Sequence, residues 1–278
     1  MTRNLRLSGL FKPNSPLQRK IKGAIFRATT RLPPPSADPK VIFTIPLVGR
    51  AKTDDWPTIQ RLLTQTLSSL LRQTDPNWSA LICCQDQPDL PDDPRIRHLP
   101  YTGPSRGSDR TKKIAMLFEE VGRTKGVDGY VFHLDADDIL HPGLVDHIRT
   151  DNNGQGYVIE TGYMFEETEP AIAHLGPEPP FWGICGSSNA LRFDHRGRRD
   201  FTEVISRRGS HTETPTRMAD YGFSLAPVPF PAALYLVNHG ASISEQRGRT
   251  EIRQGYLGKH ALSPDERDAI LTEFGVKP

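Results

Sequence analysis

Three carboxylates stand within four residues of one another, directly after an apolar stretch of the sequence. They are Asp135, Asp137 and Asp138, and they follow Tyr130–Leu134, whose residues predict a buried strand. Charges packed this closely repel one another unless a cation or strong hydrogen-bond donors offset the repulsion. Hard oxygen ligands suit Mg²⁺ or Mn²⁺ better than zinc. The segment therefore predicts a divalent-cation site, with an acidic turn that only caps the next helix as the alternative.

A basic segment, residues 103–113, contains the second candidate group. It reads Gly-Pro-Ser-Arg-Gly-Ser-Asp-Arg-Thr-Lys-Lys and leads into a predicted helix. Helix N-termini with adjacent cations favour phosphate groups, which makes Arg110 and Lys113 candidates for binding one. The segment is not a P-loop, because its glycines have the wrong spacing and no Gly-Lys-Ser/Thr follows. A solvated, basic helix start is the alternative.

The surrounding pattern alternates between strands and helices. Short apolar runs predict strands at 41–48, 78–84, 96–101 and 130–134, and helices are predicted at 58–72, at 109–121 and from 144 onward. This alternation predicts an α/β domain with a largely parallel sheet, whose strands carry ligands at their carboxyl ends. The second half predicts strands at 156–164, 184–193 and 232–237, and helices at 213–221 and 265–273.

Length and composition limit the class of protein. The chain has 278 residues, of which 36% are hydrophobic, and its mean hydropathy is −0.50. Three cysteines do not make a disulfide framework, which indicates a reducing compartment. Cys83, Cys84 and Cys185 also lack zinc-ligand spacing. No apolar run is long enough to span a membrane. The length suits one large domain or two small ones.

The first 40 residues differ from the rest in charge. They carry nine basic residues and one acid, a net charge of +8, which leaves −6 for the remainder of a chain whose total is +2. The segment ends in the Pro-rich stretch 32–39, which predicts a stiff linker. It is interpreted either as a flexible terminal arm or as an arm that contacts anionic lipid or another acidic partner. The acidic body argues against nucleic-acid binding.

Several segments in order resemble the GT-A nucleotide-sugar glycosyltransferases, especially family 2 and, within it, a bacterial group of rhamnosyltransferases. The resemblance covers roughly residues 40–245. Its pieces are Ile42–Pro46, Ser68–Thr74, Leu81–Asp86, Leu134–Asp138 and Phe181–Ala190. It implies the GT-A fold, which is Rossmann-like, with a mostly parallel sheet flanked by helices and a mixed-sheet acceptor half. The implied catalytic domain spans 41–278, with a nucleotide-binding half at 41–150 and an acceptor half at 151–278.

The resemblance also implies roles for the donor half of the site. Asp135 would contact the ribose or the metal, Asp137 would ligate the metal, and Asp138 would be a second ligand or would orient one. Asp86 would accept a hydrogen bond from the base. The remaining implied donor contacts are Pro46, Arg110, Lys113, Asn189 and Arg247.

The acceptor half departs from the family pattern. No clear Glu-Asp pair stands where inverting members keep their catalytic base, which leaves Asp200, His211, Glu213 and Asp220 as candidates. Trp182 could stack on a sugar or pack as a core residue. His239 could be a further metal ligand or an ordinary hydrogen-bonded histidine.

The resemblance predicts an enzyme that moves a sugar from a nucleotide-diphosphate donor to a glycan or lipid-linked hydroxyl, with Mn²⁺ or Mg²⁺ as cofactor. The alternatives are a metal-dependent nucleotidyltransferase and a non-catalytic module that binds nucleotide sugars. The expected location is the cytoplasm, with contact at the inner face of the membrane.

Overall fold

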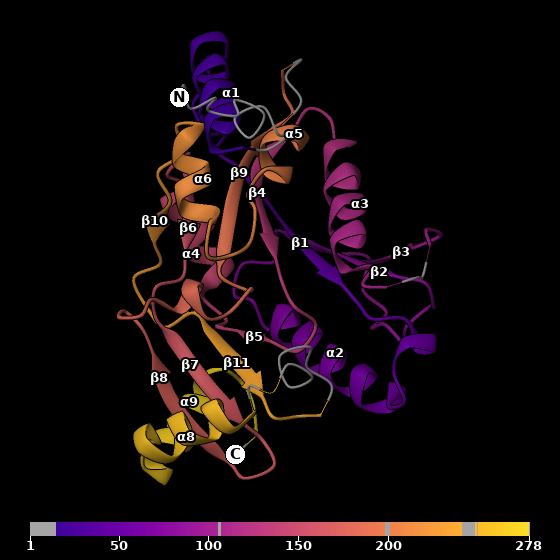
Figure 1. The fold of residues 1–278 in the computed structure, drawn as a ribbon, viewed down its shortest axis with the longest axis vertical. Helices are drawn as coiled ribbons and strands as arrows, with labels where there is room; N and C mark the ends of the chain where they lie inside the picture. Colours follow the sequence, from indigo (N-terminus) through magenta and orange to yellow (C-terminus); the bar gives the residue numbers. More distant parts are fainter. Residues whose placement is uncertain (1–14, 105–106, 198–200, 241–247, 249, 278) are drawn as a thin grey trace, which may run out of the picture.

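A computed structural model describes residues 15–104, 107–197, 201–240, 248 and 250–277. The central feature is a seven-stranded sheet in the order β10-β6-β9-β4-β1-β2-β3 (Figure 1). Its strands are β1 (Lys40–Pro46), β2 (Trp78–Cys84), β3 (Ile96–Pro100), β4 (Asp128–His133), β6 (Gly156–Val158), β9 (Asn189–Asp194) and β10 (Ala226–Pro227). Strands β3, β2, β1 and β4 are parallel neighbours, whereas β9 is antiparallel to both β4 and β6. The predicted α/β fold, Rossmann-like with a mostly parallel sheet, is confirmed.

Alternate residues of β1 enter different cores, since side chains point to opposite faces of a strand. Val41, Phe43 and Ile45 join a cluster with helices on one face, and Ile42 joins the cluster on the other. The helices of the first face are α2 (Trp56–Leu71) and α4 (Leu144–Asp151). Those of the second face are α1 (Pro16–Thr29), α3 (Arg110–Gly122), α5 (Thr202–Ser206) and α6 (Thr214–Asp220). Strand β1 is thus buried between two helical layers, as parallel strands usually are.

A second sheet of four strands lies beside the first, in the order β5-β11-β7-β8. Its strands are β5 (Ile139–Leu140), β11 (Ala233–Val237), β7 (Gly162–Glu166) and β8 (Ala171–Leu175), and the helices that accompany them are α8 (Thr250–His260) and α9 (Pro264–Glu273). The described part of the chain also contains two short 3₁₀ helices, η2 (Arg50–Lys52) and η3 (Phe181–Gly183). Because β5 begins one residue after Asp138, the acidic segment connects the two sheets.

The structure changes two predicted strands. The segment 156–164 forms β6 and β7, which belong to different sheets. The segment 184–193 starts as a loop after η3, and only its second part forms β9. Polar and glycine residues stand at both breaks, Glu160-Thr161-Gly162 in the first segment and Gly186-Ser187-Ser188 in the second, and the predicted strands ran through them.

Residues 15–40 pack against the body of the protein and do not form a flexible arm. Helix α1 packs against the body through Phe26, which is buried among Phe201, Tyr221 and Phe223. The Pro-rich stretch is also held, since Ser36 donates its backbone N–H to Asp128 over 3.0 Å. For the described part of this segment, 15–40, the interpretation as a flexible arm is therefore wrong. The division of the chain at residue 40 stays a prediction.

None of the described helices is both long enough and apolar enough to cross a membrane.

Candidate functional site

The acidic segment turns sharply after β4, and Asp138 helps to hold that turn. Its side chain is buried, and its Oδ2 accepts hydrogen bonds from Ser187 Oγ at 2.5 Å and Cys185 Sγ at 3.1 Å. Burial, with the nearby charges of Asp137 and Asp135, raises the pKa of Asp138 well above its usual value. A buried carboxyl turned toward these donors fits a residue that orients the turn. Its Oδ1 is buried without a hydrogen-bond partner in the described part of the chain, and the metal-ligand role of Asp138 stays a prediction.

Asp135 points into an ion pair. Its Oδ1 lies 2.5 Å from the guanidinium of Arg110, and its backbone N–H donates to Ser187 Oγ at 2.9 Å. Burial is the largest single influence and acts to raise the pKa of Asp135, but the contacts with Arg110 and His133 together outweigh it and leave the pKa far below the usual value. Gly186 lies so close that a Cβ there would stand 2.6 Å from Asp135 Oδ2. Two predicted residues, Arg110 and Asp135, are thus brought together.

His133, the last residue of β4, completes this group. Its Nε2 lies 3.1 Å from the Arg110 guanidinium, and a guanidinium can only donate, so Nε2 is the acceptor. Burial, followed by the charge of Arg208, lowers the pKa of His133 to about 4. The imidazole is therefore neutral at pH 7, and it fixes the guanidinium in place beside Asp135.

Asp137 faces the second sheet. Its Oδ2 lies 3.0 Å from Nε2 of His239, which follows β11 and is almost fully buried. A carboxylate oxygen and an imidazole nitrogen are both suitable ligands for Mn²⁺. The described residues contain no group of three or more His, Cys, Asp or Glu side chains placed to hold a metal ion. A Mg²⁺ or Mn²⁺ ion bound by one or two protein groups and completed by substrate phosphates fits this arrangement.

Lys113 differs from its prediction. Its side chain is 1% exposed, and its ammonium donates to the carbonyl of Leu47 at 2.6 Å and lies 3.4 Å from Asp109. Tyr101 also faces this ammonium, at 5.5 Å from its ring centroid. Lys113 therefore ties α3 to the end of β1, and its burial argues against direct contact with a phosphate.

The other donor-half predictions lie at the carboxyl ends of β1 and β2. Pro46 ends β1 beside Cys83 of β2. Asp86, two residues past β2, accepts the backbone N–H of Arg50 at 2.7 Å, which joins it to the loop after β1. The contact with a base that was predicted for Asp86 stays a prediction.

Asn189 begins β9 and is buried. Its Nδ2 donates to Ser188 Oγ at 2.9 Å, while its Oδ1 is buried without a hydrogen-bond partner in the described part of the chain. Arg247, another predicted donor contact, and Asp200, a candidate base, lie outside the described residues.

The candidate bases that the structure describes lie in different surroundings. His211 Nδ1 lies 2.7 Å from the carbonyl oxygen of Trp182, in the segment that leads to Gly186 and Ser187. Glu213 is ion-paired with Arg217 at 2.7 Å, and Asp220 is ion-paired with Arg19 of α1. These ion pairs hold Glu213 and Asp220 in structural contacts around α6, so neither is placed as a base. His211 is the candidate that the structure ties to the segment beside Asp135.

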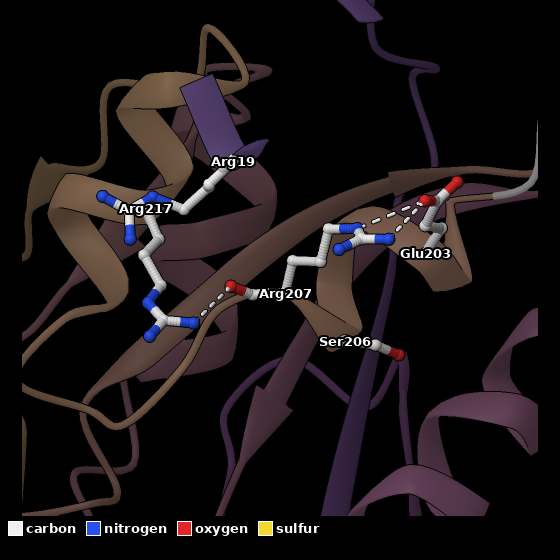
Figure 2. Close-up of a pocket in the computed structure, with 5 residues that line it drawn as sticks. All are labelled: Arg19, Glu203, Ser206, Arg207 and Arg217. Carbon is white, nitrogen blue, oxygen red and sulfur yellow. Dashed lines mark hydrogen bonds and ion pairs between the residues drawn. The ribbon is translucent and has the colours of Figure 1, made fainter. Parts of the chain in front are cut away.

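A hollow of about 280 Å³ lies between α1, α5 and α6 and is lined by Arg19, Glu203, Ser206, Arg207 and Arg217. Figure 2 shows these five residues. Its arginines are already paired with acids, as Arg207 is with Glu203 at 2.6 Å. Asp135, Asp137 and Asp138 do not line this hollow, and its charges are satisfied internally. We therefore do not assign it to the site.

The sequence analysis did not identify two residues of the site, Ser187 and Arg208. Ser187 links the backbone of Asp135 to the side chain of Asp138. It lies within Phe181–Ala190, one of the pieces of the resemblance, and directly follows Gly186. Arg208 is 6% exposed and interacts electrostatically with Arg110 and Asp135. It stands in a loop with no periodic pattern.

No protein-family model and no curated protein match the sequence. Among solved structures, the chain is similar to a 4-diphosphocytidyl-2C-methyl-D-erythritol synthase, with a TM-score of 0.39 and 13% identity over 79% of this chain and 99% of that chain. It is also similar to a 2-C-methyl-D-erythritol 4-phosphate cytidylyltransferase from Thermus thermophilus, with a TM-score of 0.38 and 14% identity over 77% and 99% of the two chains. Values this low establish neither a family nor an activity.

Proposed function

We propose that this chain is a transferase whose nucleotide substrate lies across the carboxyl ends of β1 and β4. The observation that carries the proposal is the turn after β4, where Asp135 binds Arg110 and Asp137 faces His239. In an open α/β sheet, ligands bind outside the carboxyl ends of the strands, where the strand order reverses. Here β2 and β3 extend the sheet to one side of β1, and β4 lies on the other.

Asp137 and His239 are the residues proposed to hold Mg²⁺ or Mn²⁺ together with the phosphates of the substrate. When bound, the cation would stabilise the negative charge of the leaving phosphate. The Arg110 guanidinium lies beside these carboxylates and would attract the same phosphates. Ser187 and Asp138 keep the turn in shape, so that Asp135 and Asp137 present their carboxylates on its open side.

The favoured reaction is glycosyl transfer from a nucleotide-diphosphate sugar, with His211 as the base. Because a carbonyl oxygen only accepts, the proton of His211 must be on Nδ1, which donates to Trp182. In the neutral form of the ring, Nε2 then carries no proton and could take one from an acceptor hydroxyl. The acceptor proposed is a glycan or a lipid-linked glycan.

Nucleotidyl transfer is the second candidate. It is the activity in the name of the T. thermophilus protein. A nucleoside triphosphate carries more negative charge and needs cations on more than one side. Arg50, exposed in the loop after β1 and 5.1 Å from the ring of Trp56, has no carboxylate partner among the described residues and could supply one.

The products distinguish the two reactions. One set of assays combines the protein with Mn²⁺ and a panel of nucleotide sugars, and measures released nucleoside diphosphate. The other combines it with nucleoside triphosphates and phosphorylated sugars or polyols, and measures pyrophosphate. Release of a nucleoside diphosphate supports glycosyl transfer, and pyrophosphate supports nucleotidyl transfer. If neither product forms with any substrate, the enzyme proposal fails and a module that only binds nucleotides is left.

Helix α1 supports a proposal about where the protein binds a membrane surface. Leu17, Ile21 and Ile25 are each 44–54% exposed and are spaced four residues apart, so they form one apolar stripe. Lys20 and Lys22 are exposed on either side of that stripe. An exposed apolar stripe flanked by lysines fits the surface of an anionic bilayer. We propose that α1 lies on such a surface.

A further inference from the structure

Arg208 is a buried arginine that forms no ion pair in the described structure. Its side chain is 6% exposed, and no carboxylate lies within 4.0 Å of its guanidinium among the residues that the structure describes. The chain places it by a local constraint. Its backbone N–H donates to Ile205 at the end of α5, and Gly209 then turns the chain with a φ of +75°, which favours glycine.

The surroundings of Arg208 are apolar on one side and charged on the other. Its guanidinium lies 5.6 Å from the ring centroid of Phe118, which faces it from α3. On the charged side it interacts with Arg110, Asp135 and His133. Burial and the repulsion from Arg110 lower the pKa of Arg208 to about 10, which still leaves it charged at pH 7.

The charge of Arg208 has no partner in this group. Arg110 is ion-paired with Asp135 and is also influenced by Asp137 and Asp138, whereas no carboxylate lies within 4.0 Å of the Arg208 guanidinium among the described residues. A buried charge without a partner is costly, so proteins pair such groups or use them to bind a ligand of opposite charge. The missing partner is an anion.

The neighbouring residue shows the contrast. Arg207 points into the hollow of Figure 2 and pairs with Glu203 at 2.6 Å. Arg207 and Arg208 are adjacent in sequence, but only Arg207 has its charge satisfied by the protein. The uncompensated charge is therefore specific to the side chain that faces Asp135.

We infer that Arg208 and Arg110 together bind a phosphate group of the substrate, with Arg208 as a binding residue that contacts it directly. A guanidinium presents donors in a planar fork that matches two phosphate oxygens. The two arginines approach from different elements, since Arg110 begins α3 and Arg208 follows α5. That this phosphate belongs to a nucleotide rests on the proposed function, whereas the anion site itself does not.

Binding of inorganic pyrophosphate, measured by isothermal titration calorimetry with and without Mn²⁺, tests the inference. The variants are Arg208→Met, which keeps the length of the side chain without its charge, and Arg208→Lys. Arg207→Met is the matched control. We expect Arg208→Met to weaken pyrophosphate binding by about 10- to 100-fold, the range for a lost hydrogen bond to a charged group. The pyrophosphate affinity of Arg208→Lys is expected to lie between those of Arg208→Met and the unmodified protein, because lysine offers a point charge without the planar fork of donors.

A second readout separates binding from a structural role. Removal of an uncompensated buried charge should leave the thermal midpoint of the ligand-free protein unchanged or raise it. The inference is overturned if folded Arg208→Met binds pyrophosphate within about 2-fold of the unmodified protein, or if Arg207→Met has the same effect. If Arg208→Met does not fold, Arg208→Lys decides, and undiminished binding by that variant overturns the inference. If the unmodified protein binds pyrophosphate but no nucleotide, the proposed function fails while the anion site stands.

Discussion

At the scale of single residues, adjacent residues of the same type can have different roles. Lys112 is exposed, whereas Lys113 is buried between the end of β1 and α3. The same separation distinguishes Asp138, which is buried in the turn, from Asp137, which faces His239. The orientation of the side chain decides which of two like residues belongs to the site. The sequence alone does not show that orientation.

Lys113 is expected to matter for stability. In Lys113→Met the carbonyl of Leu47 and the carboxylate of Asp109 each lose a donor, which we expect to cost about 1–3 kcal/mol of unfolding free energy. Urea denaturation measures the change. Lys112→Met is the control and should stay within about 0.5 kcal/mol of the unmodified protein. Equal effects at the two positions would show that Lys113 is not buried as described.

His211 is expected to matter for turnover. His211→Gln removes the proposed base, so we expect donor hydrolysis, with water in place of the acceptor, to slow by about 100-fold or more while donor binding is unchanged. Hydrolysis rate and donor affinity are measured separately. Glu213→Gln and Asp220→Asn should lose little of the rate. If His211→Gln hydrolyses the donor at the original rate, His211 is not the base.

The acidic segment was predictable from sequence, whereas Arg208 was not. An apolar strand that runs into Asp135 and Asp137 indicates a strand end at which ligands bind. Arg208 lies in a short loop, Ser206-Arg207-Arg208-Gly209, which has no apolar period. Its burial comes from packing against Phe118, which is 90 residues away in the chain. Contacts between residues so far apart in the chain form only in the folded structure, and no local sequence pattern predicts them.

At the scale of elements, most buried strands and amphipathic helices were predicted close to their observed bounds. The strand predicted at 78–84 is β2, and the helix predicted at 58–72 is α2, Trp56–Leu71. Helix α1 was missed because its basic residues and exposed apolar stripe obscure the small buried face made by Gly23 and Phe26. A terminal segment with high charge thus folded onto the body through only a few contacts.

Helix α1 gives a prediction for membrane contact. The full chain should co-sediment with vesicles that contain phosphatidylglycerol and only weakly with vesicles of phosphatidylcholine. Replacement of Leu17, Ile21 and Ile25 by Asn should weaken binding to the anionic vesicles by at least about 10-fold, because three apolar side chains no longer enter the bilayer.

The control for this experiment replaces other exposed apolar residues. Leu71 and Ile252 are also exposed, but they lie away from α1. A Leu71→Asn, Ile252→Asn double variant should bind the vesicles as the unmodified chain does. Unchanged binding after the three replacements in α1 would exclude the stripe as the contact. If a second copy of the chain, and not a bilayer, covers the stripe, the unmodified chain will be a dimer that the three replacements in α1 dissociate.

At the scale of the whole molecule, the acidic turn lies between two sheets. Asp135 comes from the end of β4 in the large sheet, and His239 comes from the end of β11 in the small one. The pair formed by Asp137 and His239 therefore depends on both sheets being folded. The alternation of strands and helices predicted the large sheet, but the mixed second sheet joins segments far apart in sequence, and its pairing has no local signal.

Nucleotide binding to Asp137→Asn tests the central claim most directly. Titration calorimetry with a panel of nucleoside diphosphates, in Mn²⁺ and in EDTA, should show at least one that binds the unmodified chain about 10-fold or more tightly with the metal. Asp137→Asn should lose that enhancement and keep its thermal midpoint, and the exposed Asp146→Asn should behave as the unmodified chain. If no nucleotide binds, or if Asp137→Asn keeps the full response to Mn²⁺, the account is contradicted.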